Sequence, residues 1–327
     1  MKTKKCYVYC EGILGVKTNI SNFKWVYGSN APIVSQTEYE QCAVKFEIFI
    51  RPEKRLRTIC ACDQFQSYFW DAKSNTLSCR RNLLGSIALG YDISITEEKI
   101  LVEIGSNYYR FVKKRVMNLH AVYYLLADLA NLLLLRKGYL TLYASCVHYA
   151  PGNKGMVFFA PPNTGKTVTA TRLCSSKEYS MVGEDVIIIK DHQIYSCPFT
   201  ASYRKRRTLL DSTGSIGRVD KAGSFTMCKT CEITDVFILA SGEERIACDR
   251  EEIMRKITIL NGYLFQYYSS PIIKILGYFD FLYCNDWNAL AKEKLEQIIN
   301  TNKTHILVSR DAIRYSVLAH RAIGELV

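Results

Sequence analysis

A lysine, a hydroxyl and two carboxylates give this 327-residue sequence its clearest chemical signal. Lys166 and Thr167 directly follow Gly165, and Glu184 and Asp185 come eighteen residues after the lysine. In a turn that leads into a helix, the ammonium group can reach phosphate oxygens and the hydroxyl can bind Mg²⁺. Adjacent carboxylates at the mouth of a buried strand are costly unless a cation offsets them, and Mg²⁺ would supply that charge. The pattern therefore predicts a site for a phosphate and a divalent cation.

The segments on either side of Lys166 predict the secondary structure that such a site needs. Residues 156–159 form an apolar run typical of a strand, and residues 168–174 can continue as a helix. In a strand–loop–helix unit, consecutive backbone N–H groups and the positive end of the helix surround a phosphate. The residues expected to contact it are Asn163, Thr164, Gly165, Lys166, Thr167 and Val168.

The loop departs from the usual G-x-x-x-x-G-K-[ST] pattern at its start, where Ala160 replaces the first glycine. Pro161 and Pro162 cannot donate hydrogen bonds, but the donors closest to a phosphate lie later, from residue 163 onward. Asn163 suits a position with positive φ, because asparagine enters the left-handed region more easily than most residues. Two plainer interpretations stay open: a relic loop without function, and a solvated acidic turn at Glu184-Asp185. The strand and helix around the loop favour the phosphate site.

The order of features between residues 125 and 198 resembles the kinase domain of HPr kinase/phosphorylase, whose nucleotide fold is similar to that of PEP carboxykinase. The family pattern runs from leucine-rich residues through a Leu-His-Ala-Ser-like strand, a hairpin and a Gly-Lys-Ser loop to an Asp-Asp pair. This chain carries counterparts in the same order: residues 132–135, Gly138, residues 142–145, residues 151–155, the loop and Glu184-Asp185. The resemblance covers less than a third of the chain. It implies an α/β fold with a PEP carboxykinase-like P-loop kinase core.

The resemblance also implies ATP and Mg²⁺ as cofactors and a Ser- or Thr-type hydroxyl as the phosphate acceptor. Lys166 would bind the β- and γ-phosphates, and Thr167 would bind the metal ion. Glu184 and Asp185 would share metal binding and activation of the acceptor hydroxyl, and which carboxylate does which stays open. The expected catalytic residues are therefore Glu184, Asp185 and Lys166, and the expected metal ligands are Thr167, Glu184 and Asp185.

Tyr143 occupies the position of a family histidine that lies near the transferred phosphate. A tyrosine can donate a hydrogen bond, but at neutral pH it is not an imidazole-type acid or base. His148, five residues later, could substitute only in a different strand register, and an ordinary structural histidine is the favoured interpretation. The loop alone also resembles the Gly-Pro-Pro-Gly-Thr-Gly-Lys-Thr of AAA+ ATPases, but no apolar run ending in Asp-Glu follows it.

A run of cations follows the next predicted strand, at Arg204, Lys205, Arg206 and Arg207. These side chains could hold an acidic substrate or phosphoryl oxygens, and a solvated basic loop is the equal alternative. Relatives of this kind also modify ribosomally made peptides, including the C-terminal Ser of lasso peptides, or phosphorylate small molecules. We expect a peptide or protein acceptor, for example a precursor peptide, and the departures in the loop and at Tyr143 argue against HPr itself. A small-molecule hydroxyl kinase and a non-catalytic nucleotide-binding regulatory protein are the alternatives.

Composition and hydrophobic patterning predict two globular domains. The chain is 48% hydrophobic and 23% charged, which excludes a disordered protein. Strand-type alternation at 5–9, 44–51, 91–95 and 99–104 predicts a β-rich N-terminal domain over residues 1–115. Residues 116–327 form the kinase domain, including a linking helix over 116–135 whose apolar residues recur every three or four positions.

Charge, targeting signals and cysteines limit the partners and the compartment. A net charge of +12 suits an anionic partner such as a nucleotide or an acidic peptide. No fold for nucleic-acid recognition is visible, so nucleic acid is not expected. The sequence shows no secretory signal and no membrane-spanning run, and its 13 scattered cysteines predict reduced thiols in a cytoplasm. Cys60, Cys62, Cys228 and Cys231 could hold zinc, but their unmatched spacing favours free thiols. The oligomeric state stays open, and a homo-oligomer is one option.

Overall fold

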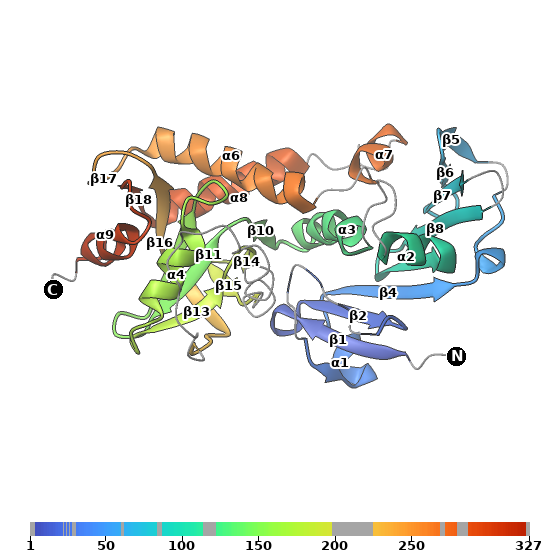
Figure 1. The fold of residues 1–327 in the computed structure, drawn as a ribbon, viewed down its shortest axis with the longest axis horizontal. Coiled ribbons are helices and arrows are strands. Elements are labelled where there is room, and N and C mark those ends of the chain that lie inside the picture. Colours follow the sequence, from blue (N-terminus) through green and yellow to red (C-terminus); the bar gives the residue numbers. More distant parts are fainter. Residues whose placement is uncertain are drawn as a thin grey trace, which may run out of the picture. The chain divides into compact units, whose positions relative to one another are not determined.

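The protein is a mixed α/β chain with two large mixed sheets, seen here in a computed structural model (Figure 1). The structure describes residues 4–21, 23, 25, 27, 31–59, 62–83, 87–113, 122–197, 225–268, 272–279 and 287–324. The chain divides into two compact units. The first unit comprises residues 1–25, 31–137 and 268–286, and the second comprises residues 26–30, 138–267 and 287–327. The α/β class expected from the sequence is thus confirmed.

The first unit is built on one mixed sheet in which β4 lies between two parallel neighbours, β2 and β9. The other neighbouring strands pair antiparallel. The strand order is β3 (Ile33–Val34), β1 (Lys5–Tyr9), β2 (Leu14–Thr18), β4 (Val44–Arg51), β9 (Lys99–Gly105), β8 (Ile87–Ile95), β7 (Thr76–Leu83), β6 (Tyr68–Asp71) and β5 (Asp63–Phe65). All four strands expected from alternation lie within β1, β4, β8 and β9, which confirms those predictions.

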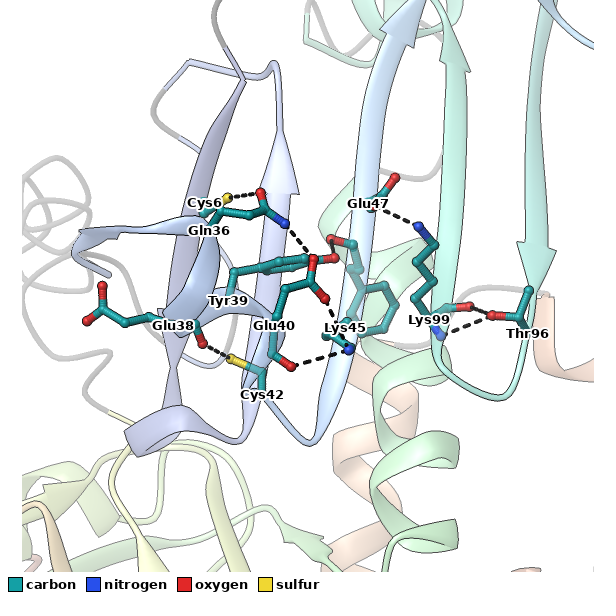
Figure 2. Close-up of polar contacts among 11 residues, drawn as sticks. Cys6, Gln36, Glu38, Tyr39, Glu40, Cys42, Lys45, Glu47, Thr96 and Lys99 are labelled. Atoms are coloured by element: carbon teal, nitrogen blue, oxygen red, sulfur yellow. Dashed lines mark hydrogen bonds and ion pairs between the residues drawn. The ribbon is translucent and has the colours of Figure 1, made fainter.

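Aromatic side chains fill the core of this sheet. The ring of Trp25 meets the rings of Tyr9 and Phe46 edge-on, with centroids 5.8 and 5.1 Å apart. A short helix, α1 (Gln36–Glu40), begins with a capping box in which Ser35 and Glu38 exchange hydrogen bonds. Figure 2 shows the polar contacts between this helix and the sheet.

The contacts in Figure 2 join α1, β4 and β9 through charged side chains. Lys45 lies 3.3 Å from a carboxylate oxygen of Glu40, and Lys99 lies 2.8 Å from one of Glu47. The Tyr39 hydroxyl donates to the backbone oxygen of Phe46 at 3.3 Å. These pairs sit on strand and helix surfaces and serve to stabilise the first unit.

Besides α1, the described residues of the first unit form three helices: α2 (Ser106–Lys113), α3 (Val122–Arg136) and α7 (Ile272–Tyr278). The linking helix expected over 116–135 is present as α3, and residues 114–121 lie outside the described residues. Within the first unit, α3 contacts β4 and α7. α3 ends at Arg136, and Gly138, two residues later, has φ of 84°, a conformation that glycine adopts readily after a helix.

The second unit carries the sequence motifs on a sheet whose centre is parallel. Strands β12 (Lys154–Phe159), β16 (Thr230–Ala240) and β18 (Lys303–Val308) run parallel, with β16 in the middle. Antiparallel strands flank them: β17 (Arg245–Ala247) lies beside β18, β11 (Ser145–Tyr149) lies beside β12, and β13 (Tyr179–Gly183) lies beside β11. The start of β16 pairs with a second group: β15 (Gln193–Tyr195), β14 (Ile187–Lys190) and β10 (Leu140–Leu142).

Helices α4 (Lys166–Leu173) and α9 (Arg314–Ala322) pack against each other, α4 also on β11 to β13 and α9 on β18 (Figure 1). Their shared core includes Phe158 and Phe237, whose rings stack with centroids 5.1 Å apart. The remaining helices of this unit are α6 (Arg250–Tyr268) and α8 (Trp287–Thr301). Burial of the β12 side chains on this core fixes the end of β12, where the loop to α4 begins. None of the helices in the described ranges is long and apolar enough to cross a membrane.

Candidate functional site

The β12–α4 loop (residues 160–165) has the strand–loop–helix layout that the sequence predicts. β12 ends at Phe159, Ala160 is fully buried, and α4 begins at Lys166. Asn163 has φ of 63°, so it adopts the left-handed conformation that asparagine tolerates. The Thr164 N–H donates to the Pro161 oxygen at 3.3 Å and closes the turn. The loop therefore folds tightly despite its missing first glycine.

Gly165 is the one loop position where only glycine fits. Its φ is 123°, and an added Cβ would lie 2.8 Å from the Cβ of Ala312, just before α9. Gly165 also caps α4 at its N-terminus, with no side chain hydrogen-bonded there. Thr167 and Val168, both half-buried, follow in the first turn of the helix. The N-terminus of α4 thus faces the loop with its backbone donors uncapped by side chains, as an anion site requires.

Lys166 is buried at the centre of the site, with 5% of its surface exposed. Its Nζ donates to the backbone oxygen of Ala160 at 2.9 Å, across the base of the loop. Burial lowers the pKa of Lys166 to about 8, and the nearby Asp185 carboxylate raises it in part. A desolvated ammonium group is a strong partner for a phosphate oxygen, because little water has to be removed from it.

The two carboxylates come from the turn between β13 and β14. This turn is tight at Gly183, where an added Cβ would lie 2.5 Å from the Cγ2 of Ile187 and 2.9 Å from the Val186 oxygen. Glu184 is 1% exposed, and its backbone oxygen accepts a hydrogen bond from the hydroxyl of Ser145 on β11. Asp185 is half-buried and interacts electrostatically with Lys166. The charge of Asp185 therefore acts on the predicted lysine.

Tyr143 lies directly over the lysine. The centroid of its ring is 4.1 Å from Lys166 Nζ, and the side chain is buried. Asn261 on α6 accepts a hydrogen bond from the Tyr143 N–H at 3.0 Å and donates to the Thr141 oxygen at 3.4 Å. Sequence reasoning missed Asn261. A polar residue beside Leu260, on the buried side of an amphipathic helix, is the signal that could have found it.

His148 lies at the other end of its strand. The register pairs Ser145 with Phe158, next to the loop, and His148 with Gly155, at the start of β12. The imidazole Nε2 of His148 is 3.0 Å from the side-chain oxygen of Asn153 in the hairpin. The structural interpretation of His148 is confirmed.

The sequence singled out two further groups of residues, the basic run and four cysteines. The basic run at Arg204, Lys205, Arg206 and Arg207 lies outside the described residues, as does Cys60. Cys62 and Cys228 are half-buried, and Cys231 is buried. Over the described ranges, no group of three or more His, Cys, Asp or Glu side chains could hold a metal ion.

A magnesium ion that is bound together with nucleotide phosphates needs fewer than three His, Cys, Asp or Glu ligands from the protein. Mg²⁺ keeps several waters and takes only one or two carboxylates beside the phosphates. The hard oxygen donors of Thr167, Glu184 and Asp185 suit that ion, and the Thr167 hydroxyl follows directly on the buried lysine.

The arrangement as a whole can neutralise a phosphate group and hold a cation beside it. The lysine comes from the start of α4, the carboxylates from the turn after β13, and the aromatic ring from the turn between β10 and β11. No protein-family model matches this chain, and no curated protein sequence matches it at a significant level.

Proposed function

We propose that this chain is an ATP-dependent phosphotransferase with a PEP carboxykinase-like P-loop core, which phosphorylates a Ser- or Thr-type hydroxyl on a peptide or protein. The observation that carries the proposal is the buried Lys166 at the start of α4, whose pKa the charge of Asp185 raises against the effect of burial. Strand, loop, lysine, helix and acidic turn follow in the order of the kinases that the sequence resembles.

Phosphoryl transfer asks the protein mainly to position the reactants and to neutralise charge. Lys166 contacts the β- and γ-phosphates, and the N–H groups of residues 163–168 surround their oxygens. Thr167, Glu184 and Asp185 would hold Mg²⁺, which supplies positive charge against the phosphates when it is bound. One of the two carboxylates accepts the proton of the acceptor hydroxyl. Asp185 suits this second role better, since it is half-buried and Glu184 is almost fully buried.

The proposal of a peptide acceptor is based on the charge of the chain. The chain carries a net charge of +12, and its basic run at residues 204–207 follows the β14–β15 hairpin in the sequence. Clustered arginines bind carboxylates and phosphates through paired hydrogen bonds. An acidic peptide, such as a ribosomally made precursor, is therefore the acceptor that we propose. We propose a cytoplasmic location, which the 13 scattered cysteines of the sequence support.

A nucleotide-binding regulatory protein without transfer activity is the second candidate. The ring of Tyr143, rather than an imidazole, faces Lys166, so the site lacks one acid–base group at the place where the related kinases carry a histidine. The sequence retains Lys166, Thr167 and both carboxylates, and these residues favour the enzyme. A small-molecule hydroxyl kinase would use the same site with a different acceptor.

The test is phosphate transfer from γ-labelled ATP with Mg²⁺ to a library of Ser- and Thr-containing peptides, using the full-length chain. Transfer should occur with the wild-type protein and be lost in Lys166→Ala. Lys177→Ala is the matched control, because Lys177 is an exposed lysine just after α4 and its removal changes the net charge equally. Nucleotide binding without transfer to any peptide or small hydroxyl compound would favour the regulatory protein.

A further inference from the structure

The ammonium group of Lys166 is held from two sides before any ligand arrives. On one side it donates to the Ala160 oxygen at 2.9 Å, and on the other it lies 4.1 Å from the centroid of the Tyr143 ring. The lysine and the tyrosine are 5% and 6% exposed, so water competes little with either contact. An ammonium group has three donors, and the carbonyl uses one of them.

The ring is itself anchored by α6. Asn261, 6% exposed, accepts from the Tyr143 N–H at 3.0 Å and donates to the Thr141 oxygen at 3.4 Å. A side-chain amide that bonds the backbone on both sides of Leu142 fixes the path of that turn. The position of the ring over the lysine is therefore set by a contact between elements more than one hundred residues apart in the sequence.

We propose that Tyr143 is a positioning residue, whose ring fixes Lys166 in the orientation that binds a nucleotide phosphate. The effect on nucleotide binding rests on the proposed function, whereas the contact that orders Lys166 does not. A free lysine side chain loses about 2 kcal/mol of rotamer entropy when it is ordered. A lysine that the ring and the carbonyl already hold loses less on binding, so the phosphate binds more tightly.

The size of the effect follows from the ring contact. A cation–π contact contributes about 0.5–1 kcal/mol at exposed sites and about 2 kcal/mol when it is desolvated. At about 1.4 kcal/mol for each factor of ten, loss of the ring should weaken nucleotide binding roughly 2- to 30-fold. The aromatic face, not the hydroxyl, carries this effect, so phenylalanine should preserve it.

The experiment compares Tyr143→Met, which fills similar space without a ring, with Tyr143→Phe. Tyr143→Leu serves as the second ring-free variant if the methionine variant does not fold. The matched control is Tyr139→Met, because Tyr139 lies under Lys190 in the same way, with Nζ 4.6 Å from the ring centroid. Each full-length variant is measured for binding of Mg²⁺–ATP and of inorganic triphosphate, and by NMR of the ¹³C-labelled lysine ε-CH₂ groups.

The ring should shift the Lys166 ε-CH₂ signal upfield in the wild type and in Tyr143→Phe. We expect this shift to disappear in Tyr143→Met, together with a 2- to 30-fold loss of affinity for both probes. Tyr139→Met should move the Lys190 signal and leave the Lys166 signal and the affinity unchanged. The signal of Lys166 is identified by its absence in Lys166→Ala.

Several outcomes would overturn the inference, and they differ from failure of the nucleotide site. An unshifted Lys166 signal in the wild type would remove the ring contact. Equal affinity in the wild type and Tyr143→Met, or an equal loss in Tyr143→Phe and Tyr143→Met, would remove the positioning role of the ring. If the wild type binds neither Mg²⁺–ATP nor triphosphate, the proposed function fails. The NMR comparison of the wild type with Tyr143→Met then still shows whether the ring contacts Lys166.

Discussion

Replacing Lys166 by methionine should change how the free energy of unfolding depends on pH. Burial lowers the pKa of Lys166 from its ordinary value of 10.5 to about 8 in the folded protein. Between these two values the unfolded chain keeps a proton that the folded chain has lost, so the stability contributed at this residue rises with pH. Lys166→Met has no such group. Relative to this variant, the wild type should therefore become more stable as the pH rises through 8.

The magnitude follows from the two pKa values. At about 1.4 kcal/mol per pH unit, burial of the charged lysine lowers stability by about 3 kcal/mol at neutral pH. Between pH 7 and pH 9.5 most of this penalty is removed, which amounts to about 2 kcal/mol. The Lys166→Met variant also lacks the hydrogen bond to Ala160 and the contact with the Tyr143 ring. These losses change the difference in stability between the wild type and the variant at neutral pH, but they do not produce its rise with pH.

The assay is urea-induced unfolding, followed by circular dichroism, of the wild type and the variant at several values between pH 7 and pH 9.5. The difference in free energy between the two proteins cancels the titration of their other groups. Lys177→Met removes the same charge from an exposed position, so its difference from the wild type should vary much less with pH. A wild type that gains nothing over Lys166→Met between pH 7 and pH 9.5 would refute the reasoning, because Lys166 would then not be a desolvated cation.

Three further changes test the other parts of the site. Asp185→Asn and Glu184→Gln should bind Mg²⁺–ATP with near-native affinity but transfer phosphate about 10²–10⁴-fold more slowly wherever the general base is lost; native rates in both, measured by transfer assays, would exclude the carboxylates. Asn261→Ala leaves the Tyr143 N–H without its partner and should lower the free energy of unfolding by about 1–3 kcal/mol; urea unfolding would show no change if this hydrogen bond were unimportant. Alanine at all of residues 204–207 should raise the KM for an acidic peptide while the affinity for ATP stays constant, and the wild-type KM should rise with salt. If kcat falls while KM stays constant, residues 204–207 act on the phosphoryl group and not on the peptide. If both constants keep their native values, residues 204–207 have no role in the reaction and form a solvated basic loop.

The elements that follow from local pattern could be predicted from the sequence. β1 and β4 have the bounds that alternation indicates. The strand before the loop and the helix after it were also expected, because their apolar spacing is local. The sequence did not indicate several other elements, among them α2, which follows directly on β9, and β13 (Tyr179–Gly183).

The site was predictable only in part, because its parts meet through long-range pairing. The loop, Lys166 and the carboxylates lie within twenty-six residues of each other and carry a recognisable order. The place of Tyr143 over Lys166 depends on the register of β11 against β12. The anchor at Asn261 depends on α6, 118 residues further along the chain. No local pattern encodes these contacts, so only the folded structure could reveal them.

The most direct test of the central claim is thermal unfolding with increasing Mg²⁺–ATP. A ligand that binds only the folded protein adds stability that grows with its concentration, reaching about 2.7 kcal/mol at roughly one hundred times the Kd. The wild type and Lys177→Ala should show this concentration-dependent rise in Tm, and Lys166→Ala should show none. Equal stabilisation of Lys166→Ala and the wild type would contradict the phosphate-binding role of the loop between β12 and α4.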